Sequence, residues 1–232
     1  MSEPESSVWN LAAPPGFRGF DEQREVAIYS RRLPHWRQDG ATYFVTFRLA
    51  DSLPEARLRE LDALQAALER RYPPPRSRAT WDQIVRARAE RIERWLDESH
   101  GSCLLADSQL AVQLTDALHH FDDERYVFGC YVVMPNHVHA LVRPLEPRHF
   151  PLEKIVGGWK QYSALRIGAA TGRRGNLWQP ESHDRIIRDE EQLYRALQYI
   201  GRNPAKAGLP SDRCLRWVRQ EWAALGWRFE EA

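Results

Sequence analysis

Two apolar runs that meet at Pro135-Asn136 constrain the fold of this chain more than any other feature. The first run covers residues 126–134, and the second covers residues 137–142. Valine recurs in both runs and aromatic residues recur in the first, and these residue types favour β-strands. A Pro-Asn pair between two such runs is typical of a tight turn. The pattern therefore predicts an antiparallel β-hairpin.

The second run also places two histidines on one face of its strand. Side chains two residues apart project from the same side of a strand, so His137 and His139 are neighbours, while Val138 points to the other side. A pair of adjacent imidazoles suits a divalent metal ion. Histidines at this spacing also occur as structural residues, so the pair alone does not establish a metal site.

Hydrophobic periodicity predicts the remaining elements. Strands are expected at residues 41–49 and 184–188. Helices are expected where apolar residues recur at intervals of three and four, at residues 55–72, 76–98, 108–121, 151–170 and 189–203. This order resembles a split βαβ arrangement, an α+β fold in which helices pack on one face of an antiparallel sheet. The histidine strand would then lie centrally, with its other face open to a substrate.

Composition divides the chain into three parts. Residues 1–40 are polar and rich in Pro, Gly and Arg, and are expected to form an extended arm with little structure of its own. Residues 41–209 contain the predicted sheet and helices, with a helical insertion at residues 76–105. Residues 210–232 are expected to form a C-terminal tail.

Charge and cysteine content narrow the class of protein. The chain has 33 basic and 32 acidic residues, so any nucleic-acid-binding surface must be local. Its three scattered cysteines contain no CxxC pair, which argues against a disulfide or thiolate zinc framework. No signal-peptide pattern and no apolar run of 18 residues is found, so we expect a cytoplasmic protein without membrane contact.

A tyrosine and an asparagine share one face of the last predicted helix. Tyr199 and Asn203 are four residues apart, which places them side by side on a helix. With the histidine pair, they supply the groups needed for metal-assisted attack on a phosphodiester. Gly201 between them costs the helix about 1 kcal/mol relative to alanine. We interpret Gly201 as a point of flexibility or of close approach by a DNA backbone.

Five motifs in this order resemble those of the REP-associated tyrosine transposases, which belong to the single-tyrosine HUH (histidine, hydrophobic residue, histidine) superfamily. The resemblance extends from about Tyr43 to Leu209. The motifs are VVMPNHVH (residues 132–139), WK (159–160), LWQ (177–179), DRIIRDEE (184–191) and YIGRNPAKAG (199–208).

The resemblance implies a fold, a reaction and partners. It implies a ferredoxin-like sheet and an enzyme that cuts and rejoins single-stranded DNA beside hairpins through a 5′-phosphotyrosine. It also implies a divalent cofactor, Mg²⁺ or Mn²⁺, held by His137, His139 and Asn203, with Tyr199 as the nucleophile. Family members are monomers or homodimers, and both states remain open for this chain.

Tyr162 is an alternative nucleophile, because it also follows the histidine pair. In the family, the tyrosine lies on the helix after the last strand and a polar ligand follows four residues later. Arg166 occupies that position after Tyr162, and a guanidinium cannot accept a metal ion. We therefore favour Tyr199.

Six residues are candidates for contacts with DNA. Arg173 and Arg174 lie beside glycines and would hold a backbone, unless they are only solvated loop charges. Trp178 would stack on a base, unless it belongs to the core. The remaining candidates are Arg48, Lys160 and Arg185.

Two other functions compete with DNA cleavage. A domesticated relative would bind hairpin DNA with little or no cutting. A zinc hydrolase unrelated to DNA would need a further ligand beside the histidine pair, and His183 and Asp184 are the nearest candidates. Asp184 could be such a neighbour of the metal, but we favour its interpretation as a residue at the end of a strand.

Overall fold

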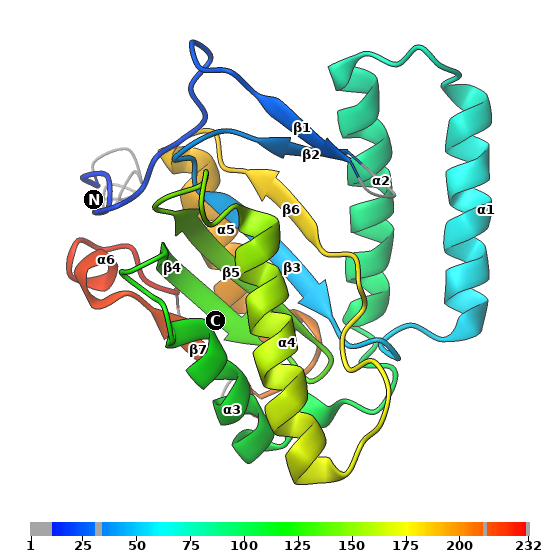
Figure 1. The fold of residues 1–232 in the computed structure, drawn as a ribbon, viewed down its shortest axis with the longest axis vertical. Helices are drawn as coiled ribbons and strands as arrows, with labels where there is room; N and C mark the ends of the chain where they lie inside the picture. Colours follow the sequence, from blue (N-terminus) through cyan, green and yellow to red (C-terminus); the bar gives the residue numbers. More distant parts are fainter. Residues whose placement is uncertain (1–10, 31–33, 211–212, 231–232) are drawn as a thin grey trace, which may run out of the picture.

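A five-stranded antiparallel sheet lies at the centre of the molecule (Figure 1). The computed structural model describes residues 11–30, 34–210 and 213–230. The strand order is β6-β3-β5-β4-β7, with β3 (Tyr43–Arg48), β4 (Tyr126–Val133), β5 (His137–Pro144), β6 (His183–Ile186) and β7 (Leu215–Val218). The first four have the split βαβ order, and β4 and β5 form the predicted hairpin. The α+β fold class and the central position of the histidine strand are confirmed.

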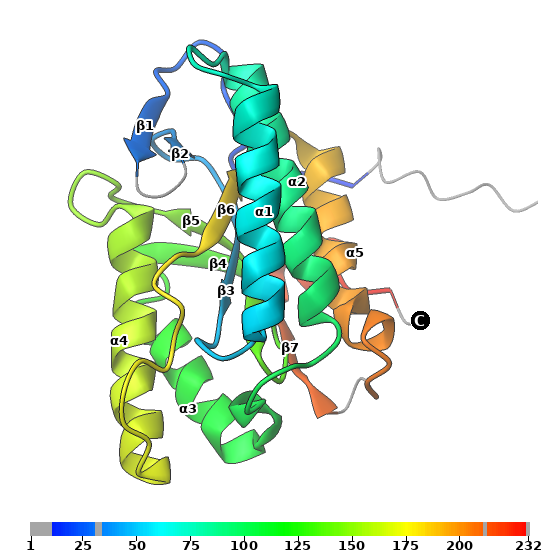
Figure 2. The ribbon, with the colours of Figure 1, turned by 90° about the vertical axis from the view of Figure 1, so that its right-hand side faces the viewer.

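Two helices cover one face of the sheet, as predicted. These are α3 (Ser108–His119), which precedes β4, and α4 (Leu152–Thr171), which joins β5 to β6. Val138, Ala140 and Val142 of β5 point into the core beneath them and are buried. Figure 2 shows both helices on the same side of the sheet.

The second face of the sheet is covered as well, so the prediction of helices on one face alone is wrong. The helix α5 (Glu190–Lys206) packs there, and Leu193, Leu197 and Ile200 bury its apolar stripe against Phe44 and Leu141. Figure 2 shows α5 on the opposite side of the sheet from α3 and α4. Asp189 caps the helix by accepting a hydrogen bond from the backbone amide of Gln192 at 2.7 Å. The side chains of α5 therefore meet the histidine face of β5.

A helical hairpin stands beside the β6 edge of the sheet (Figures 1 and 2). It consists of α1 (Glu55–Arg71) and α2 (Arg78–Leu96), and a short 3₁₀ helix, η2 (Leu104–Ala106), follows it. Leu61, Trp95 and Leu96 belong to a small core within the hairpin, apart from the two cores of the sheet. The helices predicted at residues 55–72 and 76–98 are confirmed.

The predicted N-terminal arm has more structure than expected. Its described part contains a two-stranded antiparallel ribbon of β1 (Ala27–Ser30) and β2 (Pro34–Arg37). Arg37 forms a salt bridge with Asp184 of β6 at 2.6 Å, and the Trp36 indole donates a hydrogen bond to Asp82 of α2 at 2.7 Å. These polar contacts hold the ribbon against β6 and α2. The alternating pattern within residues 27–37 is too short to predict the ribbon from the sequence.

The predicted C-terminal tail is part of the fold rather than an appendage. Its strand β7 pairs with β4 and completes the sheet, and α6 (Gln220–Ala224) follows it. The indoles of Trp222 and Trp227 are buried and donate hydrogen bonds to backbone carbonyls of residues 15 and 12. Within the described ranges, no helix is long and apolar enough to cross a bilayer.

Candidate active site

The two histidines of β5 point at each other from the face covered by α5. Their Nε2 atoms are 3.1 Å apart, and each side chain is 1 % exposed. Alternation along β5 places Val138 on the other face, in the core beneath α3 and α4. The sequence prediction that His137 and His139 share a face is confirmed.

Hydrogen bonds to the Nδ1 atoms of both histidines determine which ring nitrogen can carry a lone pair. Asn136 donates through Nδ2 to the His100 carbonyl at 3.1 Å, so its Oδ1 is the atom 2.7 Å from His137 Nδ1. An amide oxygen only accepts, so Nδ1 of His137 carries the proton and Nε2 carries a lone pair. The Nδ1 atom of His139 lies 2.7 Å from the Thr46 hydroxyl, which can either donate or accept.

Burial keeps both histidines neutral. It lowers the pKa of His137 to about 3, and the Asn203 amide partly opposes that shift. Burial and the neighbouring His137 lower the pKa of His139 well below its usual range. Neutral imidazole is the form that binds a metal ion, and partners on Nδ1 are typical of metal-ligating histidines.

The distance between the Nε2 atoms fits a shared divalent ion. Two nitrogens that each lie roughly 2.0–2.1 Å from one ion are separated by about 3 Å at right angles. Without an ion, one Nε2 must donate to the other, and the Thr46 hydroxyl allows this by donating to His139 Nδ1. The residues present therefore fit a metal site with two nitrogen ligands.

Tyr199 and Asn203 complete the site from α5. The Tyr199 ring packs edge-on against His139, with ring centroids 5.3 Å apart, and against Phe44 at 5.9 Å. Asn203 is fully buried. The Tyr199 hydroxyl and both polar atoms of the Asn203 amide are buried, and none of them has a well-formed hydrogen bond among the described residues, although the Asn203 amide lies close enough to act on the pKa values of Tyr199 and His137. Orphaned buried polar atoms are rare, and here they gather beside the histidine pair.

Two acidic residues, Glu93 of α2 and Asp97 just after it, act on Tyr199, and sequence reasoning missed them. Burial raises the pKa of Tyr199 far above its usual value near 10, and Glu93 and Asp97 raise it further. Lys206 forms a salt bridge with Asp97 at 2.8 Å, and its Nζ lies 5.4 Å from the centre of the Tyr199 ring. Acidic residues in an arginine-rich helix were a visible signal, but helical spacing alone does not show that they meet α5.

Tyr162 lies on the other face of the sheet. It belongs to α4, is 42 % exposed, and stacks on His120 with ring centroids 6.0 Å apart. The strand β5 separates it from the histidine pair. Of the two candidate tyrosines, the structure brings Tyr199 to the histidines and leaves Tyr162 away from them.

Two of the candidate DNA-contacting residues lie beside the site. Arg48 of β3 pairs in register with His137 and is 7 % exposed. Arg185 of β6 lies over the Phe44 ring at 4.8 Å and lines a cavity of about 430 Å³ together with Tyr199 and Glu93. Both arginines face the α5 side of the sheet.

The other four candidates are placed elsewhere. Trp178 is 5 % exposed and donates to the Ser163 hydroxyl at 2.9 Å, so the prediction that it stacks on a base is corrected to a core role. Lys160 donates to the backbone carbonyls of residues 179 and 180. Arg173 forms a salt bridge with Asp51 at 3.2 Å, and Arg174 is exposed just after α4.

The neighbours His183 and Asp184 separate to opposite faces of β6. His183 lines the cavity that also contains Tyr199. Asp184 pairs with Val45, a residue of the opposite core, and binds His35 at 2.7 Å and Arg37 at 2.6 Å. In the part of the chain that the structure describes, no three His, Cys, Asp or Glu side chains are grouped to hold a metal ion. The site lacks the carboxylate or third histidine that the zinc-hydrolase hypothesis requires.

Comparison with known proteins gives a distant similarity in structure. No protein-family model and no curated protein matches the chain. Among solved structures, the chain is similar to one of a REP-associated tyrosine transposase bound to a REP hairpin, with 17 % sequence identity and a TM-score of 0.36. The match covers 78 % of this chain and 74 % of that one. Sequence identity and a TM-score this low do not assign the chain to a family.

Proposed function

We propose that this protein is a metal-dependent transposase that cuts and rejoins single-stranded DNA beside hairpins through a 5′-phosphotyrosine. One observation carries the proposal. Two imidazole nitrogens 3.1 Å apart, a tyrosine hydroxyl and an asparagine amide meet on one buried face of the sheet, the last two without a well-formed hydrogen bond among the described residues. The ordered motifs that resemble the REP-associated tyrosine transposases support the choice of DNA as substrate.

His137, His139 and Asn203 would hold Mg²⁺ or Mn²⁺. The bound ion would neutralise charge on a non-bridging phosphate oxygen and orient the scissile group. Imidazole nitrogen suits Mn²⁺ better than Mg²⁺, which prefers oxygen ligands. The Nδ1 partners Asn136 and Thr46 would keep both Nε2 lone pairs aimed at the ion.

Tyr199 would supply the nucleophile. Its hydroxyl oxygen would attack phosphorus, a bond to the tyrosine would form, and the bond from phosphorus to the 3′-oxygen would break. The 3′-oxygen would take up a proton from solvent and leave as a hydroxyl. The phosphorus remains a diester, so the reverse attack by a 3′-hydroxyl can rejoin a strand without ATP. The tyrosine proton needs an acceptor, and Glu93 is the nearby carboxylate that faces the same cavity.

A denaturing gel tests this function directly. Single-stranded hairpin DNA with labelled 5′ and 3′ flanks would be incubated with Mn²⁺ and with wild type, Tyr199→Phe or Tyr162→Phe. We expect a covalent protein–DNA band for wild type and Tyr162→Phe but none for Tyr199→Phe. Loss of the band in Tyr162→Phe alone would overturn the assignment of the nucleophile.

Binding of hairpin DNA without cleavage is the second candidate function. Burial of the Tyr199 hydroxyl, together with its raised pKa, favours this alternative, because a buried neutral phenol is a poor nucleophile. Retention of hairpins on a native gel, with no covalent band for any variant, would select the binding function.

A further inference from the structure

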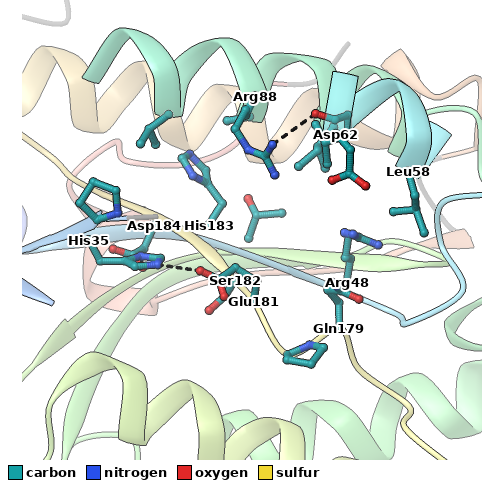
Figure 3. Close-up of a pocket in the computed structure, with 17 residues that line it drawn as sticks. His35, Arg48, Leu58, Asp62, Arg88, Gln179, Glu181, Ser182, His183 and Asp184 are labelled. Atoms are coloured by element: carbon teal, nitrogen blue, oxygen red, sulfur yellow. Dashed lines mark hydrogen bonds and ion pairs between the residues drawn. The ribbon is translucent and has the colours of Figure 1, made fainter. Parts of the chain in front are cut away.

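A cavity of about 400 Å³ lies between the α1–α2 hairpin and the edge of the sheet formed by β3 and β6 (Figure 3). Arg48, Gln179 and Glu181 line it from the strands and the loop before β6, while Leu58, Asp62 and Arg88 line it from the two helices. Its volume lies within the range of small-molecule and cofactor pockets. The cavity is separate from the cluster of His137, His139, Tyr199 and Asn203.

Apart from Asp62 and Arg88, the helical wall of this cavity is apolar. Leu58 and Leu61 of α1 and Val85 and Ile92 of α2 line it. Leu58 is 36 % exposed, so it lies where the cavity meets solvent. Apolar side chains of this kind are a surface on which proteins pack a nucleobase that has left its stack.

The opposite wall contains a buried cation, Arg48, for which the described part of the chain provides no salt bridge. Arg48 is 7 % exposed, and within the described part of the chain it donates to the Ser52 hydroxyl at 2.9 Å and forms no salt bridge. Burial lowers its pKa to about 10. Two carboxylates at the other end of the cavity, Glu181 and Asp184, are engaged with His35. Burial of a guanidinium without a salt bridge costs solvation free energy, so the site favours an anionic ligand such as a phosphate.

The cavity adjoins the candidate active site. Thr46 lines the cavity and lies 2.7 Å from His139 Nδ1. Arg48 lies directly across the strand pair from His137. Residues paired across neighbouring strands have Cβ atoms roughly 4.5–5.5 Å apart. A phosphate on Arg48 would therefore be at, or next to, the scissile phosphate.

We propose that this cavity binds one nucleotide of the single-stranded DNA beside the cleavage position, with the base under the α1–α2 hairpin and its phosphate on Arg48. The inference rests on the proposed function and extends it to a specificity site. Asp62 and Gln179 present a carboxylate and an amide to the cavity, and the Arg88 guanidinium lines it while donating to the Leu61 carbonyl and the Gln65 side chain. These groups hydrogen-bond the edges of bases, so the helical hairpin selects which base enters.

An abasic scan combined with filling of the cavity tests the proposal. The DNA is the hairpin from a random-flank library that the protein retains most strongly, with each flank nucleotide in turn made abasic. Binding is measured by fluorescence anisotropy in EDTA, so that no strand is cut. For wild type we expect one position to lose about tenfold or more in affinity, since holding a single base contributes roughly that factor.

Leu58→Trp fills the mouth of the cavity, so the affinity of this variant should no longer depend on the base at the critical position. The variant should bind intact DNA about as weakly as wild type binds the critical abasic DNA, with no further loss at that position. Leu165→Trp is the matched control, because Leu165 is 68 % exposed on α4, away from the cavity. It should behave as wild type. An equal abasic penalty at every position, or a full penalty retained in Leu58→Trp, would overturn the proposal.

Arg48→Gln gives a second, independent test should Leu58→Trp not fold. Removing one phosphate contact should weaken binding and reduce the slope of log K against log salt by about one. A neutral methylphosphonate at the neighbouring phosphate should weaken wild type but not Arg48→Gln. An unchanged salt slope would exclude Arg48 as the phosphate ligand.

The two proposals fail in different ways. A covalent band together with an even abasic scan would leave the transposase function standing and remove the nucleotide site. A single abasic-sensitive position that Leu58→Trp abolishes, with no covalent band, would leave the nucleotide site and remove cleavage. If no hairpin is retained, both proposals are wrong.

Discussion

At the scale of single residues, orientation decides what the site can do. Two histidines would form a chelating pair because Asn136 and Thr46 occupy their Nδ1 atoms and leave the Nε2 atoms facing each other. The sequence indicated Asn136 as a turn residue, and the turn is indeed where it lies. Its second role depends on the His100 carbonyl, 36 positions away, which no local pattern reveals.

Asn136→Ala should weaken Mn²⁺ binding about 10- to 100-fold, because ligand histidines lose affinity when a partner on the other nitrogen is removed. Isothermal titration with MnCl₂ measures the change. Asn176→Ala, at an exposed loop position, is the matched control and should bind Mn²⁺ as wild type does. Equal affinity in Asn136→Ala and wild type would contradict the role given to Asn136.

The pH dependence of cleavage should identify the proton acceptor. Burial raises the pKa of Glu93 above its usual value, so a base at this position becomes active as pH rises through that pKa and then stays active. In Glu93→Gln, the covalent-adduct rate should be lower at neutral pH and should keep rising into alkaline pH, as Tyr199 then loses its proton to solvent. Identical pH profiles for the two proteins would exclude Glu93 as the base.

At the scale of elements, the sequence predicted each half of the site but not how the halves meet. Period-two alternation placed His137 and His139 on one face of a strand, and the i, i+4 spacing placed Tyr199 and Asn203 on one face of a helix. Both predictions are internal to one element. That α5 covers the open face, and that α2 adds carboxylates to it, depends on packing between distant segments.

Packing against Phe229 explains Gly201 better than the functional interpretation drawn from the sequence. The sequence suggested flexibility or approach of DNA, but a Cβ at this position would lie 2.6 Å from the Phe229 ring. The glycine is needed because the C-terminal segment packs against α5. The contact links residues 28 positions apart, which helix propensity does not reveal.

Gly201→Ala should therefore destabilise the protein by about 1–3 kcal/mol, although alanine is the better helix former. Urea unfolding followed by circular dichroism measures the change. Gly157→Ala in α4 is the matched control, since nothing lies within 4 Å of its added Cβ, and it should stabilise by about 0.5–1 kcal/mol. Adding Phe229→Gly to Gly201→Ala removes the Phe229 ring and its Cβ, which lie 2.6 and 2.9 Å from the added methyl, and should relieve the clash. A double variant that merely sums the two losses would argue against it.

At the scale of the whole molecule, the ends of the chain complete the fold. The sequence predicted an N-terminal arm and a C-terminal tail. In the structure, the β1–β2 ribbon contacts β6 and α2 through polar side chains of β2, and β7 completes the sheet. Short strands of four residues have weak patterns, and they were missed for that reason. The balanced net charge is consistent with a local DNA surface, which the inward-facing Arg48 and Arg185 would supply.

The most direct test of the central claim is the position of the DNA on the protein. Wild type would be incubated with Mn²⁺ and hairpin DNA, digested with nuclease and protease, and analysed by tandem mass spectrometry. The account predicts a nucleotide phosphate on Tyr199 and none without Mn²⁺. A nucleotide on Tyr162 or on any other residue, or an adduct that forms equally well in EDTA, would contradict it.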